Sequence, residues 1–143
     1  MIIRSIKLKL RVLAFLFFIF PQYVFNQAIN FTEIKSEKDW LNALSQAEEQ
    51  NKVLFLDIYA VWCGPCKKMN NEVFSDPFVA GYYNKNFINA KVDGESQFGT
   101  ILAREFGLKG YPSMYYIDHS KFAYSVLVGF RPSENFLDYG KMI

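Results

Sequence analysis

Residues 52–66 read KVLFLDIYAVWCGPC, a strongly apolar run followed at once by two closely spaced cysteines. The segment 52–60 is dense in β-branched and aromatic residues, which is typical of a strand buried on both faces of a parallel sheet. The segment 67–74 that follows has helical character, so Cys63 and Cys66 are expected in the first turn of a helix. A buried strand that leads directly into a helix predicts a protein of the α/β class.

The remainder of the chain alternates between helical and strand patterns. Ser36 occupies a cap position with Asp39 three residues later, and Ser75-Asp76-Pro77 is a signal that stops one helix and starts the next. The expected helices are 36–50, 67–74, 98–106 and 132–143, and the expected strands are 52–60, 87–93, 113–118 and 122–128. The last two strands form a hairpin. The order of elements predicts a three-layer α/β/α sandwich with a mixed central sheet.

The N-terminal segment has the pattern of an export signal. Four basic residues precede the apolar run 12–20, which ends at the polar break Pro21-Gln22. Nine helical residues rise about 14 Å, whereas a bilayer core is about 30 Å thick. We therefore expect residues 1–26 to be a signal peptide and residues 27–143 to be the folded domain. A retained membrane anchor stays open, because no clean small-x-small cleavage site lies between residues 20 and 31.

Charge and cysteine content exclude several classes of protein. After residue 26 the chain carries twelve Lys and Arg residues against fourteen Asp and Glu residues, which is not the basic balance of a nucleic-acid-binding domain. The two cysteines are three residues apart, so a disulfide between them would constrain little chain and points to chemistry. A structural zinc site needs four ligands, and the chain offers two cysteines and one histidine, His119. We expect no metal.

The position of the cysteines at a helix start favours thiol-disulfide chemistry. Unpaired backbone N–H groups and the helix dipole stabilise the thiolate of Cys63, and the thiolate is the nucleophile. We expect Cys63, at the exposed end of the helix, to attack and Cys66, shielded by the helix, to resolve the mixed disulfide. Gly64-Pro65 suits this geometry, since a proline early in a helix gives up only an N–H that is unpaired there.

Five segments of the chain carry a family resemblance. FLDIYAVWCGPCKKM (55–69), EVFSDPFV (72–79), NAKVD (89–93), GLKGYPSMYYID (107–118) and LVGF (127–130) resemble the thioredoxin family. The sequence is most similar to exported, envelope thioredoxin-like domains, including the C-terminal domain of transmembrane disulfide reductases. The resemblance runs from Trp40 to Tyr139. Tyr59, Val61 and Ser113 depart from common thioredoxin residues, which affects the choice of partner more than the chemistry.

The resemblance implies roles for particular residues. Asp57 matches the buried aspartate that accepts a proton from the resolving cysteine, and Lys91 matches its lysine partner. A carboxylate on a core strand is costly to desolvate, which agrees with a base role, although a paired structural acid is an alternative. Pro112 matches a cis-proline that lies against the cysteine pair. The implied substrate-binding residues are Trp62, Gly64, Pro65, Tyr111, Pro112, Gly129 and Phe130, for whose aromatic members core packing is an alternative.

The function expected from these observations is reduction of protein disulfides outside the cytoplasm, in the bacterial periplasm. Its partners would be disulfide-bonded proteins and a membrane protein that supplies electrons, and no cofactor is expected beyond the Cys63/Cys66 disulfide. The chain is expected to act as a monomer. Two alternatives remain: an oxidase or isomerase of disulfides, and a binding module in which the disulfide is closed and idle.

Overall fold

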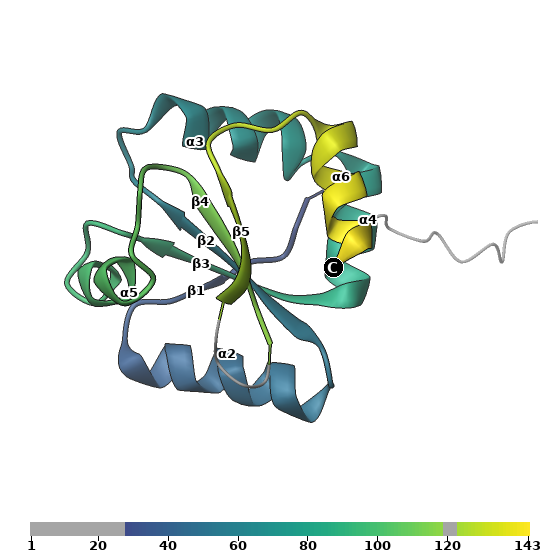
Figure 1. Cartoon of the computed structure of the whole chain (residues 1–143). Helices are drawn as coiled ribbons and strands as arrows, with labels where there is room; N and C mark the ends of the chain where they lie inside the picture. The colour runs from purple at the N-terminus through teal and green to yellow at the C-terminus, as the bar shows by residue number, and fades with distance from the viewer. Residues whose placement is uncertain (1–27, 119–122) are drawn as a thin grey trace, which may run out of the picture.

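We describe the protein from a computed structural model that covers residues 28–118 and 123–143 (Figure 1). The predicted signal peptide and the predicted hairpin turn with His119 lie outside the described residues. A five-stranded sheet forms the middle layer in the order β1-β3-β2-β4-β5. Its strands are β1 (Thr32–Glu33), β2 (Val53–Tyr59), β3 (Phe87–Asp93), β4 (Ser113–Ile117) and β5 (Ala123–Val128).

The sheet is mixed, as predicted. Strands β1, β3 and β2 run parallel to one another, whereas β4 pairs with β2 in the antiparallel sense and β5 completes the hairpin with β4. Strand β2 therefore lies at the centre, and its five inner residues are buried. The apolar composition of this strand is explained by helices on both of its faces.

Helices cover the two faces of the sheet. On one face, α2 (Glu37–Glu49) and α5 (Gly99–Glu105) pack over a core that includes Trp40, Leu44 and Leu102 (Figure 1). On the other face, the core is built around Phe55, Tyr83 and Phe136, residues of β2, α4 and α6. The covering elements on this second face are α3 (Gly64–Lys68), η1 (Met69–Val73), α4 (Pro77–Asn86) and α6 (Ser133–Met142). The three-layer prediction is confirmed.

Local sequence signals explain where these helices begin. The Ser36 hydroxyl accepts a hydrogen bond from the Asp39 backbone N–H at the start of α2. The Asp76 carboxylate accepts from the N–H groups of Phe78 and Val79, and Pro77 opens α4. These side chains satisfy backbone donors that would otherwise be unpaired.

Three features of the fold differ from the sequence prediction. Strand β1 was missed because two residues are too few to show a period. The helix at the cysteines begins at Gly64 with Cys63 as its N-cap, which agrees with the expected first turn, although the helical pattern was assigned only from residue 67. From Met69 the helix widens into the π-helical turn η1, a geometry that is frequent at functional sites.

Within the part of the chain that the structure describes, no helix combines the length and the apolar character that crossing a membrane requires.

Candidate active site

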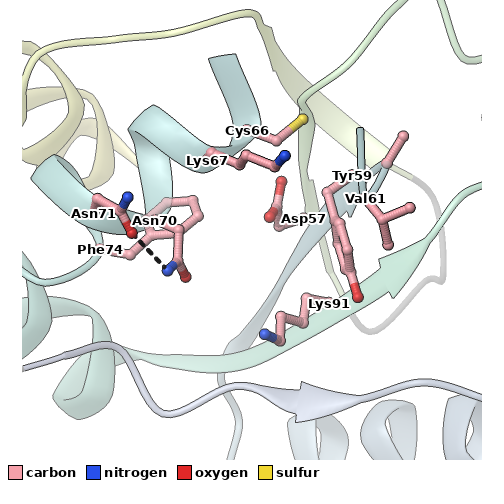
Figure 2. Close-up of a pocket in the computed structure, with 10 residues that line it drawn as sticks. Asp57, Tyr59, Val61, Cys66, Lys67, Asn70, Asn71, Phe74 and Lys91 are labelled. Carbon is pink, nitrogen blue, oxygen red and sulfur yellow. Dashed lines mark hydrogen bonds between the residues drawn. The ribbon is translucent and has the colours of Figure 1, made fainter. Parts of the chain in front are cut away.

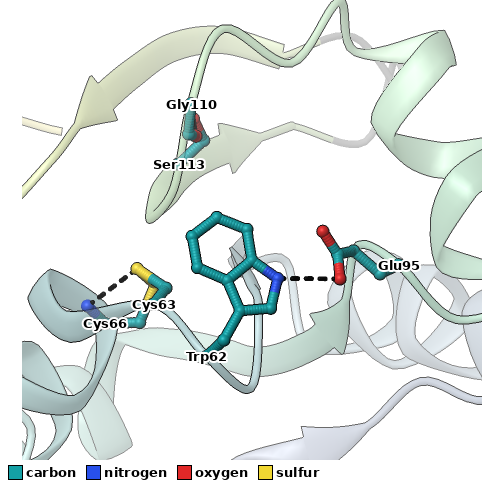
Figure 3. Close-up of a disulfide and its surroundings, with 6 residues drawn as sticks. All are labelled: Trp62, Cys63, Cys66, Glu95, Gly110 and Ser113. Atoms are coloured by element: carbon teal, nitrogen blue, oxygen red, sulfur yellow. Dashed lines mark hydrogen bonds between the residues drawn. A yellow bond between two sulfur atoms is a disulfide. The ribbon is translucent and has the colours of Figure 1, made fainter.

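The two cysteines form a disulfide at the start of α3, with their Cα atoms 5.3 Å apart (Figure 3). Cys63 is the N-cap residue, and its sulfur accepts a hydrogen bond from the Cys66 backbone N–H at 3.1 Å. Gly64 and Pro65 make up the first turn, and neither is buried. The sulfur of Cys63 therefore lies where backbone donors and the helix dipole stabilise negative charge once the disulfide is opened.

The relative exposure of the two cysteines contradicts the sequence expectation. In this disulfide-bonded form Cys63 is 2% exposed and Cys66 is 7% exposed, so Cys63 is not the open end of the pair. Tyr59 and Tyr111 pack against the cluster that the cysteines form with Ala60. A position at a helix start does not guarantee exposure, because a loop from elsewhere in the fold can cover it.

Asp57 lies on β2, on the sheet face that α3 covers. Its side chain is 5% exposed, and its Oδ1 has no hydrogen-bond partner among the described residues. Burial raises the pKa of Asp57 to about 7, and the negative charge of Glu33 adds to this effect, whereas Lys91 opposes it. The interpretation of Asp57 as a paired structural acid therefore has no support in the described residues.

One cavity of about 280 Å³ joins Asp57 to Cys66. Figure 2 shows the Asp57 carboxylate directed toward Cys66 and the active-site helix. The cavity is large and polar enough to hold water. Its lining residues are Asp57, Tyr59, Ala60, Val61, Cys66, Lys67, Asn70, Asn71, Phe74 and Lys91.

Lys91 lies beside Asp57 on the adjacent strand β3, where the two residues are partners in the strand register. Its ammonium group makes an ion pair with Glu33, at 3.0 Å from Oε1. The same ammonium lies over the rings of Phe31 and Tyr59, at 5.8 and 5.7 Å from their centroids. The structure thus brings Lys91 to the site, but its bound partner is Glu33.

The expected substrate-binding residues gather beside the disulfide, with one exception. The Tyr111-Pro112 peptide bond is cis, as the resemblance implied, and the Gly129 N–H donates to the Pro112 carbonyl at 2.8 Å. Figure 3 shows the loop that carries Gly110 and Ser113 facing the disulfide. Phe130 is the exception, because it packs against the core cluster around Phe55 and not against the cysteine cluster, and its ring lies under the ammonium of Lys68, 4.2 Å from the centroid.

Trp62 stands next to the disulfide and is 64% exposed. Its indole N–H donates to the Glu95 carboxylate at 2.9 Å, and its ring meets the ring of Tyr111 edge-on at a centroid distance of 5.9 Å (Figure 3). The indole is therefore held in place while it exposes an apolar surface. Core packing does not explain this aromatic residue.

Four residues of the site were missed from the sequence: Glu33, Asn70, Asn71 and Glu95. Asn70 and Asn71 lie four and five residues after Cys66, where the helical pattern indicated that they share the active-site helix. Glu33 and Glu95 carry no such signal, because strand pairing and a loop bring them to the site. Among the described residues, no group of three or more His, Cys, Asp or Glu side chains could hold a metal ion.

Comparison with protein families matches residues 35–118 to the family described as Thioredoxin-like. The chain belongs to the thioredoxin-like family. This confirms the family expected from the sequence, whose members include thiol-disulfide oxidoreductases, and it agrees with the Cys63–Cys66 disulfide of the structure.

Three relatives illustrate the range of the family. The chain is 36% identical to the Thioredoxin-like protein CITRX1, chloroplastic, of Nicotiana benthamiana, over 48% of this chain and 35% of the relative. It is 31% identical to the Thiol:disulfide interchange protein DsbD of Tatumella citrea, over 64% of this chain and 16% of the relative. It is 35% identical to the solution structure of a proposed disulphide-isomerase from Bacteroides thetaiotaomicron, with a TM-score of 0.69, over 81% of this chain and 93% of that one.

The chain therefore spans well under half the length of these two curated relatives, the chloroplast protein and the interchange protein. The match to the third relative, in contrast, covers most of both chains.

Proposed function

We propose that this thioredoxin-like protein reduces disulfide bonds of other proteins outside the cytoplasm, using the dithiol form of Cys63 and Cys66. The observation that carries the proposal is the buried, unpaired Asp57 carboxylate, which shares a cavity with Cys66. A base with a pKa of about 7 accepts a proton near neutral pH and releases it again, which is the property that a general base requires.

The proposed reaction transfers two electrons from the dithiol to the substrate. The thiolate of Cys63 attacks one sulfur of the substrate disulfide, forms a mixed disulfide and releases the other substrate sulfur as a thiolate, which takes a proton from water. Asp57 takes the proton of the Cys66 thiol, directly or through water in the cavity. The Cys66 thiolate then attacks the sulfur of Cys63, which closes the intramolecular disulfide and releases the second substrate sulfur as a thiolate, and the proton held by Asp57 is released to it through water.

Substrate access requires movement of the rings beside Cys63. Trp62, Tyr111, Pro112 and Gly129 form the surface next to the disulfide, and Gly64 and Pro65 complete its rim on the helix side. Rotation of partly exposed side chains is fast, on the picosecond to nanosecond scale. An extended substrate segment that displaces the Tyr111 ring would place its disulfide against Cys63.

The direction, the location and the partners of the reaction are parts of the same proposal. Gly64-Pro65 between the cysteines resembles reducing members of the family, and the signal-like N-terminal segment favours export to the periplasm. The similarity to an interchange protein supports a membrane protein as the dithiol donor. We propose that the exported domain works as a monomer and needs no cofactor beyond its own disulfide.

Insulin reduction tests the proposal. With dithiothreitol as electron source, we expect the purified protein to accelerate the precipitation of insulin chains and a Cys63→Ser variant to lose the acceleration. Equal turnover by the Cys63→Ser variant would contradict the proposal and would favour a binding module with an idle disulfide.

Disulfide isomerisation is the second candidate function. The similarity to a proposed disulphide-isomerase, 35% identical over 81% of this chain, favours it specifically. Reactivation of a scrambled, disulfide-bonded ribonuclease without added reductant distinguishes the two. The protein is added in its dithiol form and in catalytic amount, so that its Cys63 thiolate starts the exchange. A reductase is oxidised in one turnover and leaves most of the ribonuclease inactive, whereas an isomerase recovers its thiolate in each cycle and restores the activity.

A further inference from the structure

Three charged residues form a row across three adjacent strands. In the register of the parallel strands, Lys91 on β3 is the partner of Glu33 on β1 and also of Asp57 on β2. Register partners lie on the same face of a sheet, and neighbouring strands are about 4.8 Å apart. Lys91 therefore lies between two carboxylate residues on the sheet, and its flexible side chain can approach either one.

The structure shows which carboxylate holds the ammonium. Lys91 Nζ lies 3.0 Å from Glu33 Oε1, and it lies over the rings of Phe31 and Tyr59. Asp57 Oδ1 has no partner in the described part of the chain, and Figure 2 shows the Lys91 ammonium on the side away from the Asp57 carboxylate. The side chains of Lys91 and Glu33 are 30% and 38% exposed, so neither is locked in place by burial.

Few other charged groups face Asp57. Cys66 and Lys67 of α3 line the same cavity, Tyr59 follows on its own strand, and Asn70 and Asn71 of η1 are uncharged. On the other neighbouring strand, β4, the register partner is the apolar Met114. Burial has the largest effect on the pKa of Asp57, and Lys91 and Glu33 are the charged residues that modify it, whereas Lys67, which lines the same cavity, is not among its causes.

We propose that Glu33 is a positioning residue of the site: it binds the Lys91 ammonium and holds it away from Asp57, so that Asp57 stays unpaired and able to take the proton of Cys66. The benefit of this arrangement for catalysis rests on the proposed function, whereas the ion pair between Glu33 and Lys91 does not depend on it. Without Glu33, the flexible Lys91 side chain turns to the remaining carboxylate on its other side. Asp57 then gains an ion-pair partner that favours its charged form, and it becomes a poorer base.

Carboxyl titration by NMR tests this directly on the oxidised protein. In protein with ¹³C-labelled aspartate, we expect the Asp57 midpoint to move to lower pH by about one unit in Glu33→Gln. Glu48→Gln is the matched control, because Glu48 is an exposed glutamate at the far end of α2. An Asp57 midpoint that does not move in Glu33→Gln would overturn the proposal.

A double-mutant cycle tests whether Glu33 acts through Lys91. In a Lys91→Met background the ammonium is absent, so Glu33→Gln should move the Asp57 midpoint by less than half as much as it does with Lys91 present. An equal movement in both backgrounds would mean that Glu33 acts on Asp57 directly, which would overturn the positioning role.

The titration and the insulin assay separate the two proposals. A midpoint that moves as expected in a protein that does not reduce insulin supports the role of Glu33 and contradicts the proposed function. An active protein in which the midpoint stays fixed contradicts the role of Glu33 alone. In the active case, the acid limb of the pH profile for insulin reduction should move to lower pH in Glu33→Gln, in parallel with the NMR midpoint.

Discussion

Asp57 and Cys66 line the same cavity, although one lies on the central strand β2 and the other on the helix α3 above it. The Asp57 carboxylate has lost its contact with bulk water and has gained no partner for Oδ1 in the described residues. A buried carboxylate without a partner is costly, which makes this pair a testable feature of the protein.

The free energy of unfolding should depend on pH because of this buried carboxylate. Burial raises the pKa of Asp57 from 3.8 to about 7, so between these values the folded state holds a proton that the unfolded state has released. The contribution of Asp57 to stability is therefore most favourable below pH 4, and it falls as pH rises toward 7. Asp57→Asn removes this dependence.

The free energy of unfolding of Asp57→Asn, measured relative to that of the parent, should be about 2–4 kcal/mol higher at pH 8 than at pH 4. Urea unfolding of both oxidised proteins at pH 4 and pH 8 measures this difference. Any change in stability that the amide causes independently of pH cancels when the two pH values are compared. The exposed substitution Glu48→Gln serves as the control. A difference between parent and variant that is the same at both pH values would show that Asp57 is not a buried acid of raised pKa.

The roles of the two cysteines should separate in single variants. Cys66→Ser should accumulate a mixed disulfide with the substrate, because Cys63 still attacks and no second thiol releases it. Cys63→Ser should accumulate none. Mass spectrometry of the protein after incubation with a disulfide-bonded substrate measures both. The burial of Cys63, 2% against 7% for Cys66, makes the opposite result informative: trapping through Cys66 would reverse the assignment.

The ring of Tyr111 should limit access to the disulfide. Tyr111 packs against the cluster that contains both cysteines, so Tyr111→Ala should speed reduction of the disulfide by a small phosphine several-fold. Tyr124→Ala removes an aromatic ring from β5 that is 47% exposed, and it should leave the rate unchanged. Equal rates for the parent and Tyr111→Ala would mean that another group covers Cys63.

Substitution by alanine at two glycines should change the stability of the fold in opposite directions. A Cβ at Gly140 would lie 2.7 Å from the Tyr83 hydroxyl, which also donates to the Phe136 carbonyl, so Gly140→Ala should destabilise the fold by about 1–3 kcal/mol. Gly81 lies within α4 with open space around it, and Gly81→Ala should stabilise by about 0.5–1 kcal/mol. Urea unfolding measures both, and the same sign for both variants would contradict the packing described.

Elements with a strong local signal could be predicted from the sequence. Strand β3 has the predicted bounds, and the caps at Ser36 and Asp76 begin α2 and α4, because each of these features depends on residues close together in the chain. The mixed sheet followed from the alternation of strands and helices and from the final hairpin. Strand β1 could not be predicted, because it owes its existence to pairing with β3.

The site divides in the same way. The cysteine pair could be predicted from its motif and Asp57 from the family resemblance, since they lie on one continuous segment. Glu33 could not, because only the parallel register places it beside Lys91. The burial of Cys63 was also not predicted from the sequence, because the cysteine cluster is contacted by Tyr111, which comes from a loop far along the chain.

The reduction potential of the Cys63–Cys66 pair, measured in glutathione buffers, tests the proposed direction of electron transfer most directly. A dithiol that reduces protein disulfides should have a potential near that of thioredoxin, about −270 mV. A potential near −120 mV, typical of a strong oxidant, would mean that the protein accepts electrons from its substrates and would contradict the proposed reduction.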